Sequence, residues 1–364
     1  MYCRNIDVVC GTDCYKRTVN IIKIPFDEIF VKRYFFIICA HTKKNERNDA
    51  FVFRGKIVIV GAGFVGSTTA YTIMCGGLFS DIVILDIDKN KAEGDAMDIA
   101  HGVSFVRPVN IRSGGYDECA DADIVVITAG ENQKPGETRL DLLQKNTNIL
   151  KDVVSGIMKY APKDIIILTV SNPVDILTYV TWKLSGLPKN QVIGSGTVLD
   201  TSRLKYMLSR HTHVDARNCH TYIIGEHGDS EVAAWSISSI AGIPMRDYER
   251  QTGLCSQSAC NEMYNKVKNA AYEIIQKKGA TYYAIALAVS RITECIAGEQ
   301  DSFLTVSSIM EGEYGIEGTA LSIPAKVSGF GIDWIPEVPF SESEMNGLKQ
   351  SSEIMREYIS KLNI

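Results

Sequence analysis

A histidine between two glycines is the side chain of this sequence best placed for acid–base chemistry. His227 lies in the run GEHGD, directly after an apolar segment, 220–224, that we predict to be a strand. A lone histidine is more often structural. An imidazole in a tight loop just beyond a strand can exchange a proton with a ligand, because its ordinary pKa lies near neutral pH. His227 is therefore the candidate acid–base residue.

An acid and an arginine three positions apart lie in the run LDTSR. On a helix, Asp200 and Arg203 share one face. The plainest interpretation is a surface ion pair, which contributes little to stability. The alternative is that the Asp200 carboxylate points to a histidine, while the Arg203 guanidinium binds a substrate carboxylate through paired hydrogen bonds.

Two more polar side chains follow predicted strands. Arg139 ends the loop AGENQKPGETR, which follows a strand at 124–128 and contains a proline and a glycine. Such a loop can close over a substrate, exclude water and deliver a cation, although an isolated loop arginine is more commonly a solvated surface group. In the run SNPVD, after a strand at 165–170, Asn172 is expected to direct its amide into the same crevice. Taken alone, this run is just a strand-ending turn.

A glycine-rich turn marks the part of the chain that must hold the ligand. A near-continuous apolar strand, 56–60, runs into Gly61, Gly63 and Gly66 in G-x-G-x-x-G spacing. The first glycine permits the tight turn, the second lets the backbone approach a diphosphate, and the third allows close helix–strand packing. The helix predicted at 67–74 would present its N-terminal N–H groups to that diphosphate.

Asp86 completes this unit. It follows a second apolar strand, 82–85, and lies about 20 residues after Gly66. A carboxylate at this place receives the ribose hydroxyls of NAD and repels the extra phosphate of NADP. Glycines alone also mark ordinary turns, but strand, glycines, helix, strand and acid in this order favour NAD binding.

Strands and helices alternate through the first half of the chain. Strands are predicted at 57–60, 82–85, 124–128 and 165–170, with helices between them, notably at 91–100 and 139–160. This alternation predicts an α/β fold with a doubly wound parallel sheet of the Rossmann type. The ligand crevice of such a sheet lies beyond the carboxyl ends of its strands.

The organisation changes near residue 196. Longer helices and hairpin-like strands follow, and a last amphipathic helix is predicted; the strands are expected at 220–224, 306–310 and 318–327, and the helix at 343–362. We therefore expect a NAD-binding Rossmann domain at 51–195 and an α+β catalytic domain at 196–364. Residues 1–50 mix basic and apolar residues without a sustained period and are assigned no function.

Charge and composition argue against several classes of protein. A net charge of −5 over 364 residues disfavours a nucleic-acid-binding surface. No apolar run reaches the roughly 18–20 residues that cross a bilayer, so no membrane association is expected. The ten cysteines show no metal-ligand spacing. We therefore expect no metal site, reduced thiols and a cytoplasmic location.

Six motifs follow one another along the chain: GAGFVG with Asp86, AGENQKPGETR, SNPVD, LDTSR, GEHGD, and KKGATYY at 277–283. In this order they resemble the NAD-dependent L-lactate/malate dehydrogenase family, with the bacterial L-lactate dehydrogenases as the nearest kind. The resemblance covers about residues 51–362. It implies the lactate/malate dehydrogenase fold, a homotetramer or dimer, and reversible hydride transfer between NADH and pyruvate that gives (S)-lactate and NAD+.

The resemblance also implies a role for each motif. His227 would donate a proton to the ketone oxygen of pyruvate, and Asp200 would fix its tautomer and favour its protonated form. Arg203 would bind the substrate carboxylate, for which lysine is a poor substitute, and Arg139 would polarise the carbonyl. The other implied substrate contacts are Gln133, Asn172 and Thr281, and the implied cofactor contacts are Gly61, Gly63, Val65, Gly66, Asp86, Lys91, Gly130, Ser171, Asn172, Ser195 and Ile285.

Gln133 decides the expected substrate. In this family its position faces the variable end of the substrate, where malate dehydrogenases carry an arginine that pairs with the second carboxylate of oxaloacetate. A neutral glutamine offers that carboxylate no counter-charge, so its burial would be unfavourable, whereas a methyl group is accepted. Pyruvate is therefore the expected substrate, with the neighbouring Lys134 expected to point outward.

Two residues bear on regulation. Many bacterial L-lactate dehydrogenases are activated by fructose 1,6-bisphosphate at a subunit interface, through an arginine two positions after the substrate-binding arginine and a histidine seven before the catalytic one. Here these positions hold Lys205 and His220. An ammonium group cannot replace the guanidinium fork, so we expect bisphosphate binding to be weakened or lost.

Three other functions stay open at this point. A dehydrogenase of malate or of a bulkier 2-hydroxy acid has the same motifs and differs in substrate preference. An NAD-dependent glycosidase has a similar cofactor domain but needs a metal site, for which the sequence offers no convincing cluster of ligands. A non-catalytic NAD-binding protein would not require Arg139, Asp200, Arg203 and His227 together.

Overall fold

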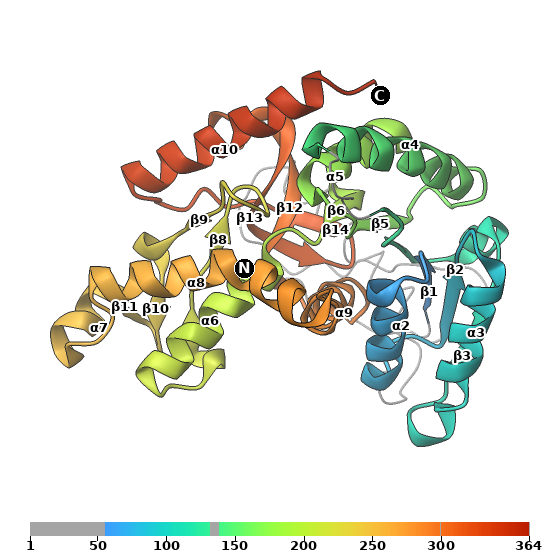
Figure 1. The fold of residues 1–364 in the computed structure, drawn as a ribbon, viewed down its shortest axis with the longest axis horizontal. Helices are drawn as coiled ribbons and strands as arrows, with labels where there is room; N and C mark the ends of the chain where they lie inside the picture. The colour runs from blue at the N-terminus through green and yellow to red at the C-terminus, as the bar shows by residue number, and fades with distance from the viewer. Residues whose placement is uncertain (1–54, 132–137, 299, 364) are drawn as a thin grey trace, which may run out of the picture. The chain divides into compact units, whose positions relative to one another are not determined.

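The computed structural model describes residues 55–131, 138–298 and 300–363 (Figure 1). The stretch 1–50, to which no function was assigned, lies outside these ranges, and so do Gln133 and Lys134. The side chain of Arg139 is likewise outside the described part. In the described ranges, no helix combines the length and the apolar character that crossing a bilayer requires.

A parallel sheet occupies the first half of the chain. Its strands are β1 (Lys56–Val60), β2 (Asp81–Leu85), β3 (Asn110–Ser113), β4 (Ile124–Ile127), β5 (Ile166–Thr169) and β6 (Val192–Gly194), in the spatial order β3-β2-β1-β4-β5-β6. The direction of winding reverses between β1 and β4, which is where a doubly wound sheet opens its ligand crevice. The predicted Rossmann sheet is confirmed. Strands β3 and β6 were not predicted, because they carry too few apolar residues to stand out.

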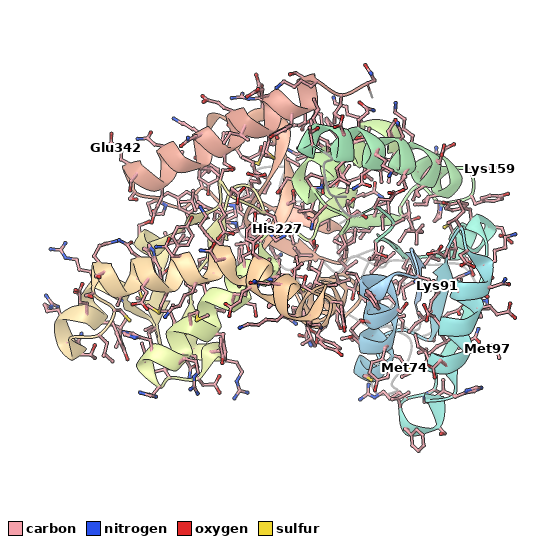
Figure 2. All side chains as sticks on the ribbon, in the orientation of Figure 1. Met74, Lys91, Met97, Lys159, His227 and Glu342 are labelled. Carbon is pink, nitrogen blue, oxygen red and sulfur yellow. The ribbon has the colours of Figure 1, made fainter. Side chains whose placement is uncertain are left out.

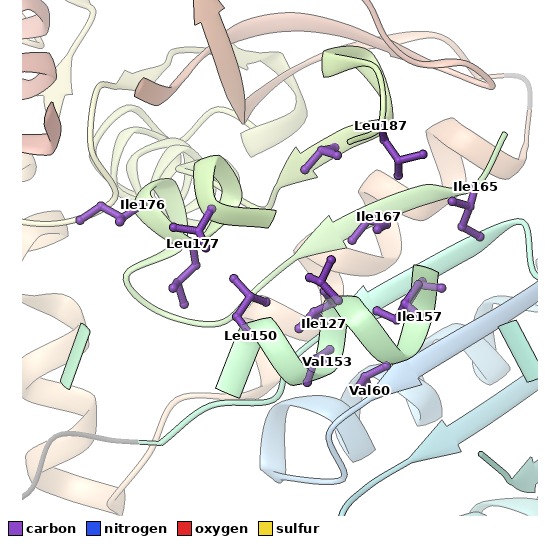
Figure 3. Close-up of a cluster of buried hydrophobic side chains, with 14 of the residues drawn as sticks. Val60, Ile127, Leu150, Val153, Ile157, Ile165, Ile167, Ile176, Leu177 and Leu187 are labelled. Carbon is purple, nitrogen blue, oxygen red and sulfur yellow. The ribbon is translucent and has the colours of Figure 1, made fainter. Parts of the chain in front are cut away.

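Helices cover both faces of this sheet (Figure 1). They are α2 (Phe64–Gly76), α3 (Lys89–Ala100) and α9 (Tyr283–Ala297) on one face, and α4 (Arg139–Met158) and α5 (Val174–Ser185) on the other. Successive residues of a strand point to opposite faces. Ile57 and Ile59 of β1 therefore join the core under α2 and α9, while Val58 and Val60 join the core under α4 and α5. Figure 3 shows part of the second core, where α4 packs over the strands.

The C-terminal strands extend the same sheet. β12 (Ser302–Glu311), β13 (Glu317–Ser328) and β14 (Gly331–Trp334) are antiparallel neighbours, and β12 pairs with β6, which gives one sheet of nine strands. The positions of β12 and β13 were predicted, but they were expected in a separate α+β domain. Without β12, strand β6 would be an edge with unpaired backbone groups. A local pattern cannot show which edge a distant hairpin covers.

The other elements surround this sheet. They are the helices α6 (Val198–Thr212), α7 (Met245–Thr252), α8 (Gln257–Lys278) and α10 (Glu342–Ser360), and the short strands β7 (Cys219–His220), β8 (Ile223–Ile224), β9 (Val232–Ala233), β10 (Ser239–Ile240) and β11 (Ile243–Pro244). Short 3-10 helices lie at Val103–Phe105, Tyr116–Asp121, Lys189–Gln191, Ala216–Asn218, Trp235–Ile237 and Glu313–Gly315. β8 and β9 form a hairpin, whereas β7, β10 and β11 form a three-stranded sheet.

The segment 220–224, predicted as one strand, is divided between two sheets. β7 ends at His220 and β8 begins at Ile223. Two threonines at the start of α6 explain the break: Thr201 in the helix and Thr197 directly before it. Ile223 donates its N–H to Thr201 Oγ1 at 2.9 Å, and its carbonyl accepts a hydrogen bond from Thr197 Oγ1 at 2.5 Å. These contacts fix the GEHGD loop, which follows β8, against the helix that carries the LDTSR run.

Candidate active site

The carboxyl ends of the parallel strands carry many of the predicted ligand contacts. These are Gly61 after β1, Asp86 after β2, Gly130 beyond β4, Ser171 and Asn172 after β5, and Ser195 after β6. The Ser171 hydroxyl donates to the carbonyl of Ala129 at 2.6 Å and thereby joins the ends of β4 and β5. Asn172 is exposed, whereas Ser195 is buried. The predicted residues therefore gather along one edge of the sheet.

The glycine loop leaves room for a diphosphate. Gly61 has a φ of +112°, and a Cβ there would lie 2.7 Å from Thr128 Oγ1. A Cβ on Gly66 would overlap the carbonyl oxygen of Gly61, so that helix α2 can pack closely on the turn. A Cβ on Gly63 would meet no protein atom within 4 Å, and α2 begins there without a side-chain cap. Space and unpaired helix N–H groups are what a dinucleotide needs at this position.

Asp86 and Lys91 both hold this loop. One carboxylate oxygen of Asp86 accepts the N–H of Ala62 at 2.6 Å, and the other accepts the N–H of Asp88 at 2.9 Å. The ammonium group of Lys91 donates to the carbonyl of Ala62, and Figure 2 shows Lys91 between α2 and α3. These two predicted cofactor residues therefore also set the shape of the turn.

The proposed acid–base residue, its carboxylate and the arginine meet in one chain of contacts. His227 Nδ1 lies 2.5 Å from Asp200 Oδ2, and Arg203 Nη1 donates to Asp200 Oδ1 at 2.7 Å. Asp200 is 2% exposed, so its charge is screened little by water. With Nδ1 engaged, Nε2 is the ring nitrogen that His227 can offer to a ligand. Figure 2 shows His227 near the centre of the view.

Electrostatics favour a protonated His227. Burial by itself lowers its pKa, but the charge and hydrogen bond of Asp200 outweigh burial, and Asp175 and Glu231 add to them, which raises the pKa to about 9. Burial would raise the pKa of Asp200, yet the neighbouring His227 and Arg203 lower it. The pair therefore exists as carboxylate and imidazolium at neutral pH.

Asp175 positions the histidine from the opposite side. This fully buried carboxylate accepts the backbone N–H of His227 at 2.7 Å and the hydroxyl hydrogen of Ser307 at 2.6 Å. Burial raises its pKa to about 6 despite these bonds. The sequence showed Asp175 only as the last letter of SNPVD and assigned it no contact, because its partners on the GEHGD loop and β12 are far away along the chain.

Asn146 is a second residue that sequence analysis missed. From the buried face of α4, its Oδ1 accepts the N–H of Glu131 at 2.8 Å, and its Nδ2 donates to the carbonyl of Asn172 at 2.9 Å. It therefore links the ends of β4 and β5 where the crevice opens. One signal in the sequence could have indicated it. Asn146 and Thr147 are polar residues on the apolar face of α4, between Leu143 and Leu150.

The remaining predicted substrate residues are only partly described. Gln133 lies outside the described residues, and helix α4 begins at Arg139, where Thr138 Oγ1 caps it by accepting the N–H of Asp141 at 3.1 Å. Thr281 is half-buried just before α9, and Ile285 packs on the core under α2. The Phe64 and Tyr282 rings stack at 5.2 Å and join this segment to the glycine loop.

The two predicted effector residues do not lie in one cavity. Lys205 lines a cavity of about 300 Å³ between α6, α9 and β12, together with Arg291, Tyr222 and Phe303. Burial lowers the pKa of Lys205, and Arg291 lowers it further. His220 is exposed on β7 and is not part of that lining.

Two family models match the chain. The NAD binding domain of lactate/malate dehydrogenase matches residues 55–194, and the alpha/beta C-terminal domain of lactate/malate dehydrogenase matches residues 197–363. An L-lactate dehydrogenase of Acetivibrio thermocellus is 58% identical over 310 residues, which cover 85% of this chain and 98% of the relative. L-lactate dehydrogenase 1 of Clostridium acetobutylicum is 54% identical over 84% of this chain and 98% of its own length.

Solved structures have the same fold. The minor L-lactate dehydrogenase of Enterococcus mundtii, in its ligand-bound form, gives a TM-score of 0.83 at 40% identity and covers 86% of this chain and 99% of its own. A lactate dehydrogenase from a Medee basin deep-sea metagenome library gives a TM-score of 0.82 at 44% identity. This match covers 84% of this chain and 98% of the neighbour's chain. The resemblance inferred from six motifs is thus confirmed, and with it the fold class and NAD as cofactor. The chain belongs to the lactate/malate dehydrogenase family.

Proposed function

We propose that this protein is an L-lactate dehydrogenase, which reduces pyruvate to (S)-lactate with NADH and catalyses the reverse reaction. The observation that carries the proposal is the chain of contacts from Arg203 through Asp200 to His227, beside a strand edge that leaves room for NAD. Relatives that are 54–58% identical and named L-lactate dehydrogenase support it.

Each side chain of the site has its own role in the proposed reaction. Bound NADH would supply the hydride for the ketone carbon. Arg203 binds the substrate carboxylate and so orients the ketone toward His227. Protonated His227 gives the proton on Nε2 to the ketone oxygen, and Asp200 stabilises the imidazolium before transfer. In lactate oxidation the neutral imidazole takes the hydroxyl proton, which explains why one pair serves both directions.

Arg139, Asn172 and Thr281 complete the proposed substrate site. Arg139 would approach the ketone oxygen when the loop before α4 closes, and a cation there stabilises the developing negative charge. Asn172 would donate its amide near the same oxygen, which its exposed position after β5 supports. Thr281 would line the pocket where the segment before α9 meets the glycine loop.

Substrate choice is assigned to Gln133. We propose that its neutral amide accepts the methyl group of pyruvate and gives the second carboxylate of oxaloacetate no partner. The test is steady-state NADH oxidation with each 2-oxo acid. A kcat/KM for pyruvate that exceeds that for oxaloacetate by orders of magnitude would support the proposal. Preference for oxaloacetate would identify a malate dehydrogenase and would bring a cation such as Lys134 into the pocket.

We propose the remaining cofactor contacts and the domain boundaries together. Val65, Gly130, Ser171, Ser195 and Ile285 would line the NAD crevice with the glycine loop, because most of them lie at strand ends on its edge. The NAD-binding domain would comprise 51–195 and the catalytic domain 196–364, a division supported by the change between matched family models near residue 195.

We propose a cytoplasmic location. The cysteines in the described part of the chain are all unpaired, which supports this proposal.

We propose that the protein is a homotetramer or dimer. Large apolar side chains on the neighbouring helices α2, α6 and α9 support this, since Phe64 is 70%, Tyr206 58% and Leu287 64% exposed. Exposed apolar side chains that gather on neighbouring helices are a common feature of subunit interfaces. Sedimentation of the full chain at several concentrations measures the state directly, and a monomer at micromolar concentration would contradict the proposal.

We also propose that Lys205 and His220 retain a weakened response to fructose 1,6-bisphosphate. The support is a half-buried ammonium group without an ion-pair partner among the described residues, in a cavity that Arg291 also lines. Assays with and without the bisphosphate test this. Lys205→Arg should strengthen activation, whereas no response in either protein would remove the effector.

A further inference from the structure

A buried carboxyl group beside the acid–base pair has no part in the mechanism above. Glu231 follows His227 by four residues and is 5% exposed. Among the described residues, its Oε1 is one of two buried side-chain oxygens without a hydrogen-bond partner. Buried polar atoms are nearly always paired, so this oxygen requires an explanation.

The hairpin of β8 and β9 holds Glu231 in place. Its neighbour Val232 pairs with Ile224. The N–H of Glu231 donates to the carbonyl of Gly228 at 3.2 Å, and the carbonyl of Glu231 accepts a hydrogen bond from the Tyr264 hydroxyl of α8. These two contacts fix the backbone at Glu231, and the side chain is buried there.

Charged groups face Glu231 from three elements. Helix α6 contributes Asp200 and Arg203, the GEHGD loop contributes His227, and α8 contributes Lys268. A cavity of about 350 Å³ lies between the loop and α10, and its lining includes Glu226, Asp229, Ser230, Gly347 and Gln350. The part of α10 at this cavity is uncharged. Glu231 therefore lies between the proposed substrate site and a route to solvent.

The protonation of Glu231 changes the charge of the site. Burial raises the pKa of Glu231, and the Asp200 carboxylate raises it further, to about 8, although the nearby cations oppose this. At neutral pH Glu231 therefore holds a proton. Arg203 and protonated His227 are then the cations nearest to the place of the substrate carboxylate, with Lys268 on α8. Asp200, Asp175 and the buried Glu226 already oppose them with negative charge.

We propose that Glu231 is a positioning residue that must be protonated for the substrate carboxylate to bind beside Arg203. Ionised Glu231 would add a further buried negative charge to this group of carboxylates, and it would repel the substrate carboxylate that Arg203 binds. The neutral acid also needs fewer partners than a carboxylate, which accounts for the unpaired oxygen. This inference rests on the proposed reduction of pyruvate.

Glu231→Gln tests the inference, because glutamine keeps the shape and stays neutral at every pH. In the wild-type protein, kcat/KM for pyruvate should fall about a hundredfold per pH unit at high pH, since Glu231 and His227 each lose a proton. In the variant it should fall about tenfold per unit and should match wild type below pH 7. Asp229→Asn, which removes the exposed carboxylate of the same loop, should keep the two-proton profile.

Equal slopes in the wild-type protein and in Glu231→Gln would overturn the inference. A second measurement needs no variant: proton uptake when oxamate, an isostere of pyruvate that is not reduced, binds to the complex with NADH at pH 9. With pKa values of about 9 and about 8, His227 and Glu231 together should take up more than one proton per site. Uptake of one proton or less would also overturn it. A failure to reduce pyruvate at any pH would instead remove the proposed function.

Discussion

Replacing the Asp200 carboxylate by an amide should remove most of the acid–base chemistry. Asp200→Asn keeps the shape of the side chain but removes the main charge that holds the pKa of His227 at about 9 against burial. A return to the ordinary value of 6.5 corresponds to about 3 kcal/mol, at about 1.4 kcal/mol per pH unit. Burial favours a pKa below 6.5 in the variant, whereas the remaining carboxylates Asp175 and Glu231 favour one above it.

The size of the loss depends on pH. Pyruvate reduction needs protonated His227, so activity is present below its pKa and is lost as the pH rises through it. A shift to 6.5 reduces the protonated fraction about tenfold at pH 7.5 and about 200-fold at pH 9.5. We expect kcat/KM for pyruvate to fall by about these factors.

Two assays check this prediction. NMR titration of the ¹⁵N-labelled imidazoles gives the pKa of His227 directly, with the signal assigned by its absence in His227→Gln. The pH dependence of kcat/KM gives its effect on reduction. Asp229→Asn is the matched control, since this exposed acid lies two residues from His227 and should leave its pKa near 9. A pKa near 9 in Asp200→Asn as well would refute the electrostatic reasoning.

Four further substitutions test other parts of the site. Arg203→Lys should raise the KM for pyruvate about 10- to 100-fold, with less effect on kcat, because one charge-assisted hydrogen bond of about 1.5–3 kcal/mol is lost; an unchanged KM would remove Arg203 from carboxylate binding. Gly66→Ala should lower the melting temperature, because its Cβ would overlap the Gly61 carbonyl oxygen and such overpacking costs about 1–3 kcal/mol. Gly63→Ala has open space and should keep the melting temperature but weaken NADH binding; full affinity would contradict the diphosphate position. Gln133→Arg should shift the ratio of kcat/KM values from pyruvate toward oxaloacetate, and a constant ratio would mean that position 133 does not face the substrate.

Local sequence was sufficient for most of the parallel strands of the Rossmann sheet, although not for β3 and β6. β1, β2, β4 and β5 lie within one or two residues of their predicted positions, because a parallel strand buried on both faces needs an uninterrupted apolar run. The requirement for glycine at Gly66 is also local, since its Cβ would overlap the Gly61 carbonyl oxygen in the same turn. Gly61 is crowded instead by Thr128, which is 67 residues away along the chain. The order of motifs identified the family for the same reason: each motif is short and complete in itself.

Tertiary structure alone decided which sheet the C-terminal hairpin joins and which polar groups support His227. Asp175 reaches Ser307, 132 residues away, and Asn146 reaches Asn172, 26 residues away. Glu231 resembles any acid near a strand until its burial and its charged neighbours are known. A residue type and its spacing can identify a group that could carry a proton. Whether it does so at neutral pH depends on desolvation and on charges brought together from distant segments, and these exist only in the folded chain.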